Sequence, residues 1–262
     1  MKHWICIMLL ATASSPAADR LNIAEDDAAH SGYGGGWGTG KNVGTGFGAW
    51  FLRSSGVGPR DSHAGFFIEA DNVQGEISAL ALGGKAFSIF ANGLGHENAV
   101  AFRAFGAPLQ VQDAFSLLFQ GGTFRQKFES DDERTGAVGF SLRTGTANAE
   151  TSDLSTGERL RVSNTEGEAN YQIIDGESDR DSGVPVNDAG VSATVLLTGP
   201  DTYDLEITDL DTNNTHRLQG RKLGGSPGAP IESFAIFNLD AEDGDVRFNG
   251  FQVTRPFTSL PR

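Results

Sequence analysis

The stretch Val191–Thr208, VSATVLLTGPDTYDLEIT, decides the fold class of this chain. Apolar and polar residues alternate on both sides of Gly199-Pro200-Asp201, which are typical turn residues. Alternation with a period of two places the apolar side chains on one face of a strand. The stretch therefore predicts a β-hairpin that belongs to an antiparallel sheet and buries one of its faces.

The rest of the chain repeats this pattern in short segments separated by turn residues. The best helical candidate, 74–82, is short, and 177–190 is interpreted as a polar loop. Many of the 18 phenylalanines lie at alternating strand positions, where they can form a core. About a dozen strands at this spacing predict an all-β sandwich or barrel. The predicted strands outside the hairpin are 47–53, 64–69, 85–91, 99–105, 114–120, 137–143, 160–163, 169–174, 215–218, 232–238 and 246–254.

Residues 1–18 have the form of a secretory signal peptide. Lys2 precedes a short apolar run, 4–11, and small residues suited to cleavage follow at 14–18. The run is too short to span a bilayer. We expect a protein that is secreted, at the cell surface or periplasmic. Because the single cysteine, Cys6, lies within this run, the expected mature chain has no disulfide.

Four segments follow from these patterns. They are the signal peptide, 1–18, a Gly-rich N-terminal segment, 19–46, a β-sandwich domain, 47–255, and a C-terminal tail, 256–262. Within the second segment, 19–30 is polar and acidic and is expected to be a mobile approach to the first strand. The formal net charge of −14 argues against binding to nucleic acid or to an anionic membrane surface.

The order of these features resembles a group of secreted bacterial proteins with a concanavalin-A-like jelly roll of the lectin and glucanase type. The resemblance lies in a Gly-rich start that runs into FGAWFLR, then KAFSIFANG, AVAFRAF, GAVGFSLRTG and the hairpin, and it extends over about 34–253. Many such proteins carry a C-terminal membrane-sorting tail, which this chain lacks. The resemblance implies an antiparallel β-sandwich. The fold group includes lectins, carbohydrate-binding modules, glycoside hydrolases and polysaccharide lyases, so the fold alone does not choose a function.

Candidate glycan-binding residues combine aromatic rings with planar polar groups. Tyr33 and Trp37 lie in the Gly-rich segment, Asn92 and His96 at the turn after strand 85–91, and Arg103 in the next strand. An aromatic ring packs on the apolar face of a sugar while amide, imidazole and guanidinium groups bind its hydroxyls. Asn92 can equally be a turn residue and His96 a surface residue. Trp37 is the most informative, since a large aromatic among glycines needs either a packing partner or a ligand.

One acidic turn is a candidate calcium site. Asp240, Asp243 and Asp245 lie within six residues beside Gly244, between two predicted strands. Carboxylate oxygens on a glycine-containing loop suit Ca²⁺. The alternative is a hydrophilic hairpin turn, because Asp, Asn and Gly are the ordinary turn residues.

The sequence favours a role without catalysis. Asp204 and Glu206 form the one strand-borne carboxylate pair worth testing, and they lack the third carboxylate of the retaining-glycosidase pattern. A solvent-facing strand surface explains them as well. We therefore predict a secreted, lectin-like protein whose partner is a carbohydrate or cell-surface polysaccharide. A glycoside hydrolase or polysaccharide lyase, and a structural or adhesive surface protein, are the alternatives.

Overall fold

The computed structural model describes residues 19–57, 63–70, 80, 82–92, 96–121, 124, 135–146, 153–178, 180–240 and 245–257. The predicted signal peptide and nearly all of the helical candidate 74–82 lie outside the described residues. The elements are β1 (Arg20–Asp26), the 3₁₀ helix η1 (Ser31–Tyr33), β2 (Phe47–Val57), β3 (Ala64–Ala70), β4 (Lys85–Ala91), β5 (His96–Phe105), β6 (Ala114–Gln120), β7 (Ala137–Arg143), β8 (Glu158–Thr165), β9 (Asn170–Ile174), β10 (Arg180–Pro185), β11 (Val191–Gly199), β12 (Thr202–Asp209), β13 (Thr215–Lys222), β14 (Ser233–Leu239) and β15 (Val246–Pro256).

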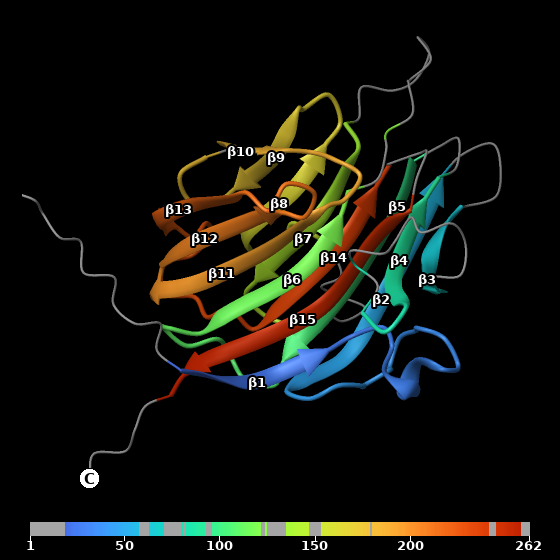
Figure 1. Ribbon diagram of the computed structural model, residues 1–262, viewed down its shortest axis with the longest axis horizontal. Helices are drawn as coiled ribbons and strands as arrows, with labels where there is room; N and C mark the ends of the chain where they lie inside the picture. The colour runs from blue at the N-terminus through green and yellow to red at the C-terminus, as the bar shows by residue number, and fades with distance from the viewer. Residues whose placement is uncertain are drawn as a thin grey trace, which may run out of the picture.

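These strands form two antiparallel sheets that lie one over the other (Figure 1). The eight-stranded sheet has the order β13-β12-β11-β6-β15-β4-β3, and β1 pairs with the second half of β15. The seven-stranded sheet has the order β10-β9-β8-β7-β14-β5-β2. The chain crosses repeatedly between the sheets, as in a jelly roll. The predicted fold class, an all-β antiparallel sandwich of jelly-roll type, is confirmed.

The hairpin that predicted the fold is β11 and β12. Val195 pairs with Leu205 and Leu197 with Tyr203, and these four side chains are all buried. Their sequence neighbours on the opposite face are partly exposed. Because one face of the hairpin packs on the core, a slip of the register by one residue would turn the buried side chains into solvent.

The core between the sheets is aromatic. Phe234 of the seven-stranded sheet lies 4.9 Å from Phe115 and 5.2 Å from Phe251 of the eight-stranded sheet, measured between ring centroids. All three rings are at most 1% exposed. Each fully buried ring of this kind stabilises the fold by roughly 2–3 kcal/mol relative to exposure. The alternating phenylalanines therefore form the core, as predicted.

Two strands were missed by the sequence patterns. The segment expected to be a mobile acidic approach contains β1, which pairs with β15 from Arg20↔Pro256 to Asp26↔Phe251. Only Ala24 and Asp26 of this strand are buried, so its apolar alternation is too weak to detect. The expected polar loop 177–190 contains β10, whose two buried residues are Ser182 and Val184. Segment 19–46 is thus part of the sandwich and not a separate approach to it.

Within the part of the chain that the structure describes, we find no helix with the length and apolar character needed to cross a membrane.

Candidate functional site

A buried ion pair joins β1 to the seven-stranded sheet. Arg103 on β5 donates to Asp26 Oδ2, and neither side chain has exposed surface. The same guanidinium donates to the carbonyl of Gly48 at 2.9 Å and to that of Val43, and so holds the loop after η1 in place. Burial raises the pKa of the Asp26 carboxyl, and Arg103 offsets part of that rise.

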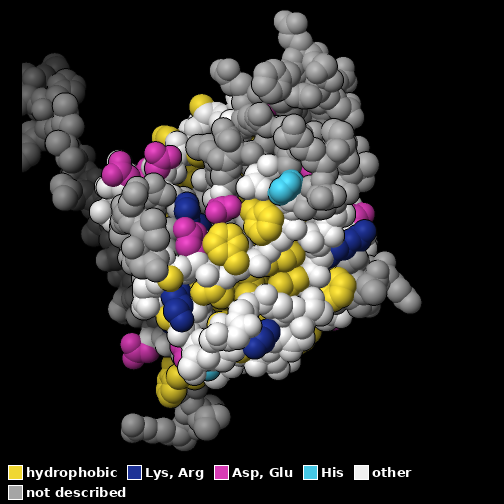
Figure 2. Space-filling model, turned by 90° about the vertical axis from the view of Figure 1, so that its right-hand side faces the viewer, with side chains coloured by type: hydrophobic (Ala, Val, Ile, Leu, Met, Phe, Trp, Pro, Cys, Tyr) yellow, Lys and Arg dark blue, Asp and Glu magenta, His cyan; other side chains and the backbone are white. Residues whose placement is uncertain are grey.

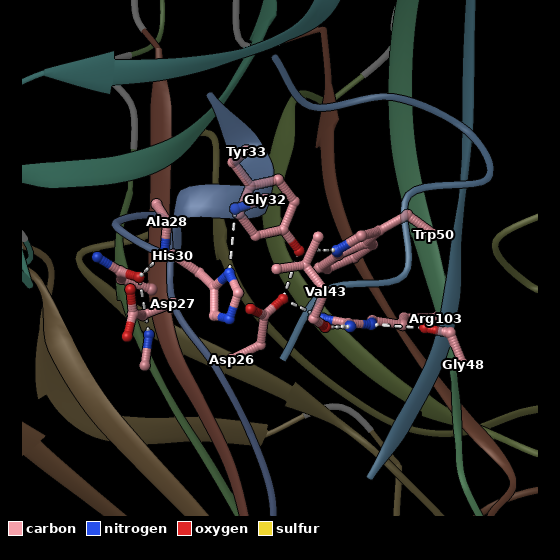
Figure 3. A network of polar contacts seen from close by, with 12 residues as sticks. Asp26, Asp27, Ala28, His30, Gly32, Tyr33, Val43, Gly48, Trp50 and Arg103 are labelled. Carbon is pink, nitrogen blue, oxygen red and sulfur yellow. Dashed lines mark hydrogen bonds and ion pairs between the residues drawn. The ribbon is translucent and has the colours of Figure 1, made fainter. Parts of the chain in front are cut away.

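Tyr33 and Trp50 complete this network (Figure 3). The Tyr33 hydroxyl donates to Asp26 Oδ2 at 2.5 Å and accepts from Trp50 Nε1 at 2.9 Å. Burial, reinforced by the hydrogen bond to Asp26, raises the pKa of Tyr33. The Arg103 guanidinium lies 4.8 Å from the centroid of the Trp50 ring, a favourable cation–π distance. Tyr33 and Arg103 thus bind other protein groups inside the core, which corrects their predicted role as ligand contacts.

Trp37 is also part of the core. Its ring lies 5.2 Å from Trp50, 5.4 Å from Phe66 and 5.0 Å from Phe87, in edge-to-face or steeply inclined contacts. The side chain is 7% exposed, and its Nε1 has no hydrogen-bond partner among the described residues. Of the two explanations for a tryptophan among glycines, the structure supplies the packing partner, which corrects the predicted role of Trp37 as a ligand contact.

The outer face of the seven-stranded sheet carries a second apolar cluster. Along β14, Phe234 and Ile236 face the core between the sheets, while Ala235 and Phe237 belong to the other cluster. Leu154, from the loop between β7 and β8, packs on this outer cluster. The side chain of Phe237 is fully buried, so this part of the outer face is covered, whereas Arg53 and Ser55 on β2 are exposed.

Arg143 on β7 fixes the covering loop. Its guanidinium donates to the carbonyl of Asp153 at 3.0 Å and to those of Leu154 and Thr156. It also lies 4.8 Å from the centroid of the Phe102 ring. Burial lowers the pKa of Arg143. A carbonyl-bound buried arginine therefore sets the height and position of Leu154 above the sheet.

A surface pocket of about 430 Å³ lies beside this loop. We call it the sheet pocket; it is lined by Arg53, Ser55, Asn98, Val100, Asp153, Leu154 and Leu239. The strand register brings the lining together, since Arg53 pairs with Val100, Ser55 with Asn98, and Asn98 with Leu239. The lining combines three aliphatic side chains with a guanidinium, a hydroxyl, an amide and a carboxylate.

The sheet pocket was not found from the sequence. Its polar residues occupy outward positions on two strands and one loop, and only the pairing of β2 with β5 brings Arg53 and Asn98 together. The predicted strand 99–105 begins one residue after Asn98, so it left out one of the two residues of β5 that line the pocket. The sequence also could not indicate which loop covers this face.

The remaining predicted glycan-binding residues are Asn92 and His96. Asn92 is exposed just after β4, where its N–H donates to the His63 carbonyl at 2.9 Å. His96 begins β5, where its backbone pairs with Val57, and its side chain lies outside the described residues. The structure does not bring Asn92 into the sheet pocket or the network around Asp26.

The predicted calcium residues are only partly described. Asp240 Oδ1 accepts the Glu97 N–H at 2.7 Å, and Asp240 adopts a φ of 51°. Asp243 lies outside the described residues. Burial and the charge of Glu69 raise the pKa of Asp245. Among the described side chains, no group of three His, Cys, Asp or Glu could hold a metal ion. The part of the turn that is described thus shows a capping carboxylate and not a formed metal centre.

The strand-borne carboxylate pair is a structural feature. Asp204 Oδ1 accepts the Gly220 N–H at 2.7 Å, and Glu206 forms an exposed ion pair with Arg217 at 2.7 Å. Both carboxylates therefore bind the neighbouring edge strand β13, which favours the solvent-facing interpretation of this pair.

An apolar area is visible on the side of the molecule where β2, β3, β4 and β5 lie. Figure 2 shows hydrophobic side chains gathered near the middle of this side, with acidic and basic side chains around them. Phe67 and Phe90 on β3 and β4 are half-buried, and their ring centroids lie 6.2 Å apart, while the neighbouring Phe66 packs on the core between the sheets. Beside them, Arg247 makes a two-pronged ion pair with Glu69.

Comparison with known proteins yields matches only among solved structures. No protein family and no curated protein sequence matches the chain. The globular domain of T. cruzi calreticulin is similar with a TM-score of 0.46 and 11% identity, covering 78% of this chain and 87% of that chain. The carbohydrate recognition domain of Emp46p, in a metal-free form, has a TM-score of 0.42 and 10% identity, covering 80% and 89%.

The exoplasmic/lumenal domain of VIP36, in a form bound to Ca²⁺ and Man3GlcNAc, has a TM-score of 0.44 and 7% identity, covering 81% of this chain and 87% of that chain. These scores and identities are low. The site of this chain therefore rests on its own residues.

Proposed function

We propose that this protein binds neutral glycans in the sheet pocket and does not catalyse a reaction on them. The observation that carries the proposal is the lining: an aliphatic floor of Val100, Leu154 and Leu239 with four hydrogen-bonding side chains around it. A sugar ring has apolar C–H faces and a rim of hydroxyls that both donate and accept. Arg53 and Asn98 can donate to these hydroxyls, and Asp153 and Ser55 can accept from them.

The pocket volume of about 430 Å³ suits one or two sugar rings. Its floor is aliphatic, so the stacking contribution of an aromatic ring is missing. We expect a dissociation constant of about 1 mM for a single sugar. A polysaccharide should bind more tightly, because its repeated units raise the local concentration of ligand.

The absence of catalysis is supported by the state of the carboxylates. Asp204 and Glu206 are engaged with β13, and both oxygens of Asp153 accept from Ser155 at 3.0 Å. A general acid and a nucleophile need two carboxyl groups that flank one bond. Among the residues that the structure describes, the lining of the sheet pocket contributes one carboxylate, that of Asp153.

We also propose that the protein acts outside the cytoplasm. The support is the form of residues 1–18 and the position of the single cysteine, Cys6, within them. N-terminal sequencing of the protein recovered from its producing cells tests this directly. An intact Met1 on the accumulated protein would contradict it.

The glycan proposal is tested by saturation-transfer NMR with a panel of neutral sugars, followed by an array of neutral oligosaccharides. We expect Asn98→Ala to weaken binding about tenfold, because Asn98 lies between Ser55 and Leu239 of the lining and its amide could no longer donate to a sugar hydroxyl. Asp204→Asn, on the distant hairpin, is the matched control and should bind as the parent does.

Two results would overturn the proposal. An absence of binding to every sugar of the panel and the array would favour the structural or adhesive alternative. Release of reducing ends or unsaturated products from a polysaccharide panel would favour the hydrolase or lyase alternative.

A further inference from the structure

The amide of Asn98 differs from the other polar groups that line the sheet pocket. Asn98 is half-buried on β5, and among the residues that the structure describes no group hydrogen-bonds its side-chain amide. Arg53 and Ser55 are exposed, and the two oxygens of Asp153 already accept from Ser155 at 3.0 Å. Because a half-buried amide is only partly hydrated, it gains more from a ligand than an exposed group does.

The strand register places aliphatic side chains beside this amide. Leu239 on β14 pairs with Asn98, so the Cβ atoms of the two residues lie about 5 Å apart. Val100 follows two residues along β5 on the same face, at a distance of about 7 Å. Leu154 belongs to the same outer cluster as Val100 and is held there by Arg143. A group that hydrogen-bonds to Asn98 would therefore have aliphatic carbon close to its own substituents.

The apolar surface that reaches the sheet pocket is small. None of the described lining residues is aromatic, and the rings of Phe102 and Phe237 in the outer cluster are at most 1% exposed. Val100 and Leu154 are themselves only 6% and 7% exposed. The lining therefore lacks the broad flat platform that suits the face of a sugar ring, whereas an aliphatic surface of this size can cover a single methyl group.

We propose that the sheet pocket recognises the acetamido group of a 2-acetamido-2-deoxy sugar, an inference that rests on the proposed glycan binding in the same pocket. The Asn98 amide donates to the acetamido carbonyl. The acetamido N–H points the opposite way, because the amide is planar and trans, and it donates to the Asp153 carboxylate, which keeps acceptor sites beyond its two bonds to Ser155. The acetamido methyl group lies against Val100, Leu154 and Leu239.

The test is an NMR titration of the whole protein with the methyl β-glycosides of N-acetylglucosamine, N-formylglucosamine and glucose. The acetamido glycoside should bind about tenfold more tightly than the glucoside, since it adds hydrogen bonds and a buried methyl group. The formamido glycoside keeps the amide and lacks the methyl group, so it should bind about fourfold more weakly than the acetamido glycoside. In saturation-transfer spectra the acetyl methyl protons should receive the largest signal.

Two variants separate the two parts of the acetamido group. Asn98→Ala should lower the preference for the acetamido glycoside over the glucoside by about fivefold, because the carbonyl loses its donor. Leu154→Ala should reduce the difference between the acetamido and formamido glycosides and leave the formamido glycoside bound more tightly than the glucoside. Asp204→Asn on the hairpin is the matched control and should keep the order of affinities found for the parent.

Failure of this inference can be told apart from failure of the proposed function. Equal affinities of the parent for the acetamido glycoside and the glucoside would overturn the acetamido inference and leave glycan binding in place. A preference that Asn98→Ala leaves unchanged would also overturn it, because the acetamido group would then bind elsewhere. An absence of binding by these glycosides and by every sugar of the neutral panel would overturn both.

Discussion

Arg103 and Arg143 are two buried arginines that each fix a loop, yet they are satisfied in different ways. Arg103 pairs with Asp26 and also binds two carbonyls. Arg143 binds three carbonyls of one loop, and no carboxylate is among these partners. Both guanidinium groups lie 4.8 Å from an aromatic ring centroid.

This difference in partners predicts which property of the protein each arginine affects. Removing a partner of Arg103 leaves a buried charge uncompensated, so the whole fold suffers. Removing Arg143 frees the carbonyls of a surface loop, which water can reach once the loop moves. Arg103 therefore stabilises the sandwich as a whole, whereas Arg143 determines the shape of the sheet pocket.

The largest expected effect on the free energy of unfolding follows from removing Asp26, the partner of Arg103. Asp26→Ala should lower the free energy of unfolding by about 3–5 kcal/mol, because Arg103 remains buried and unpaired. Urea denaturation followed by tryptophan fluorescence measures this. In the double variant Asp26→Ala/Arg103→Met the loss should be smaller than the sum of the two single losses. Additive losses would show that the pair is not coupled.

Arg143→Met should cost less, about 1–3 kcal/mol, because it removes hydrogen bonds but leaves no buried partner charge. It should also weaken sugar binding more than tenfold, since Leu154 and Asp153 lose their position in the sheet pocket. Hydrogen exchange should rise in 153–158 and not in β11 or β12. If protection from hydrogen exchange fell equally in all strands, Arg143 would stabilise the whole fold, as Arg103 does, and not only the loop.

A capping carboxylate is the intermediate case. Asp240→Ala should lower the free energy of unfolding by about 1 kcal/mol, because the Glu97 N–H loses its 2.7 Å partner. If Asp240 acts only as a cap, this loss is equal with Ca²⁺ and with a chelator. A loss seen only with Ca²⁺ would support the predicted calcium site at Asp240, Asp243 and Asp245.

The partly buried ion pair of Arg247 and Glu69 should show its effect on stability through pH. Hydrogen bonds and charge from Arg247 lower the pKa of Glu69 in the folded protein despite the opposing effect of burial. A lowered folded pKa adds stability above the unfolded value, and this stability is lost as the pH falls through the folded value. The parent should therefore exceed Glu69→Gln in stability at pH 7, by under about 1 kcal/mol. The two should converge in acid; a gap that widens there would contradict the assignment.

The smallest effect is expected where the arginine is most exposed. Glu206→Gln removes an ion pair whose side chains are 42% and 66% exposed, and it should change the free energy of unfolding by less than about 0.5 kcal/mol. Thermal denaturation at low and high salt is the measurement. A loss above 1 kcal/mol would mean that the contributions of these arginine ion pairs to stability do not follow the exposure of their side chains.

The sequence by itself determined the class of the fold. Alternation over Val191–Thr208 predicted β11 and β12 with the correct buried faces, because a period of two follows from strand geometry alone. The same local argument located most of the other strands. It missed β1, because a strand whose inward side chains are Ala24 and Asp26 has no apolar alternation to detect.

Only the tertiary structure decided what the polar and aromatic residues do. Tyr33, Trp37 and Arg103 had the composition of a sugar site, and packing turned them into core, because β1 and the Gly-rich segment close over β5. The sheet pocket arises from register between β2 and β5 and from a loop fixed by Arg143. Side chains that meet through long-range strand pairing leave no local pattern in the sequence. Short segments of the sequence therefore predict the strands of the sandwich, whereas the pocket can be seen only in the folded structure.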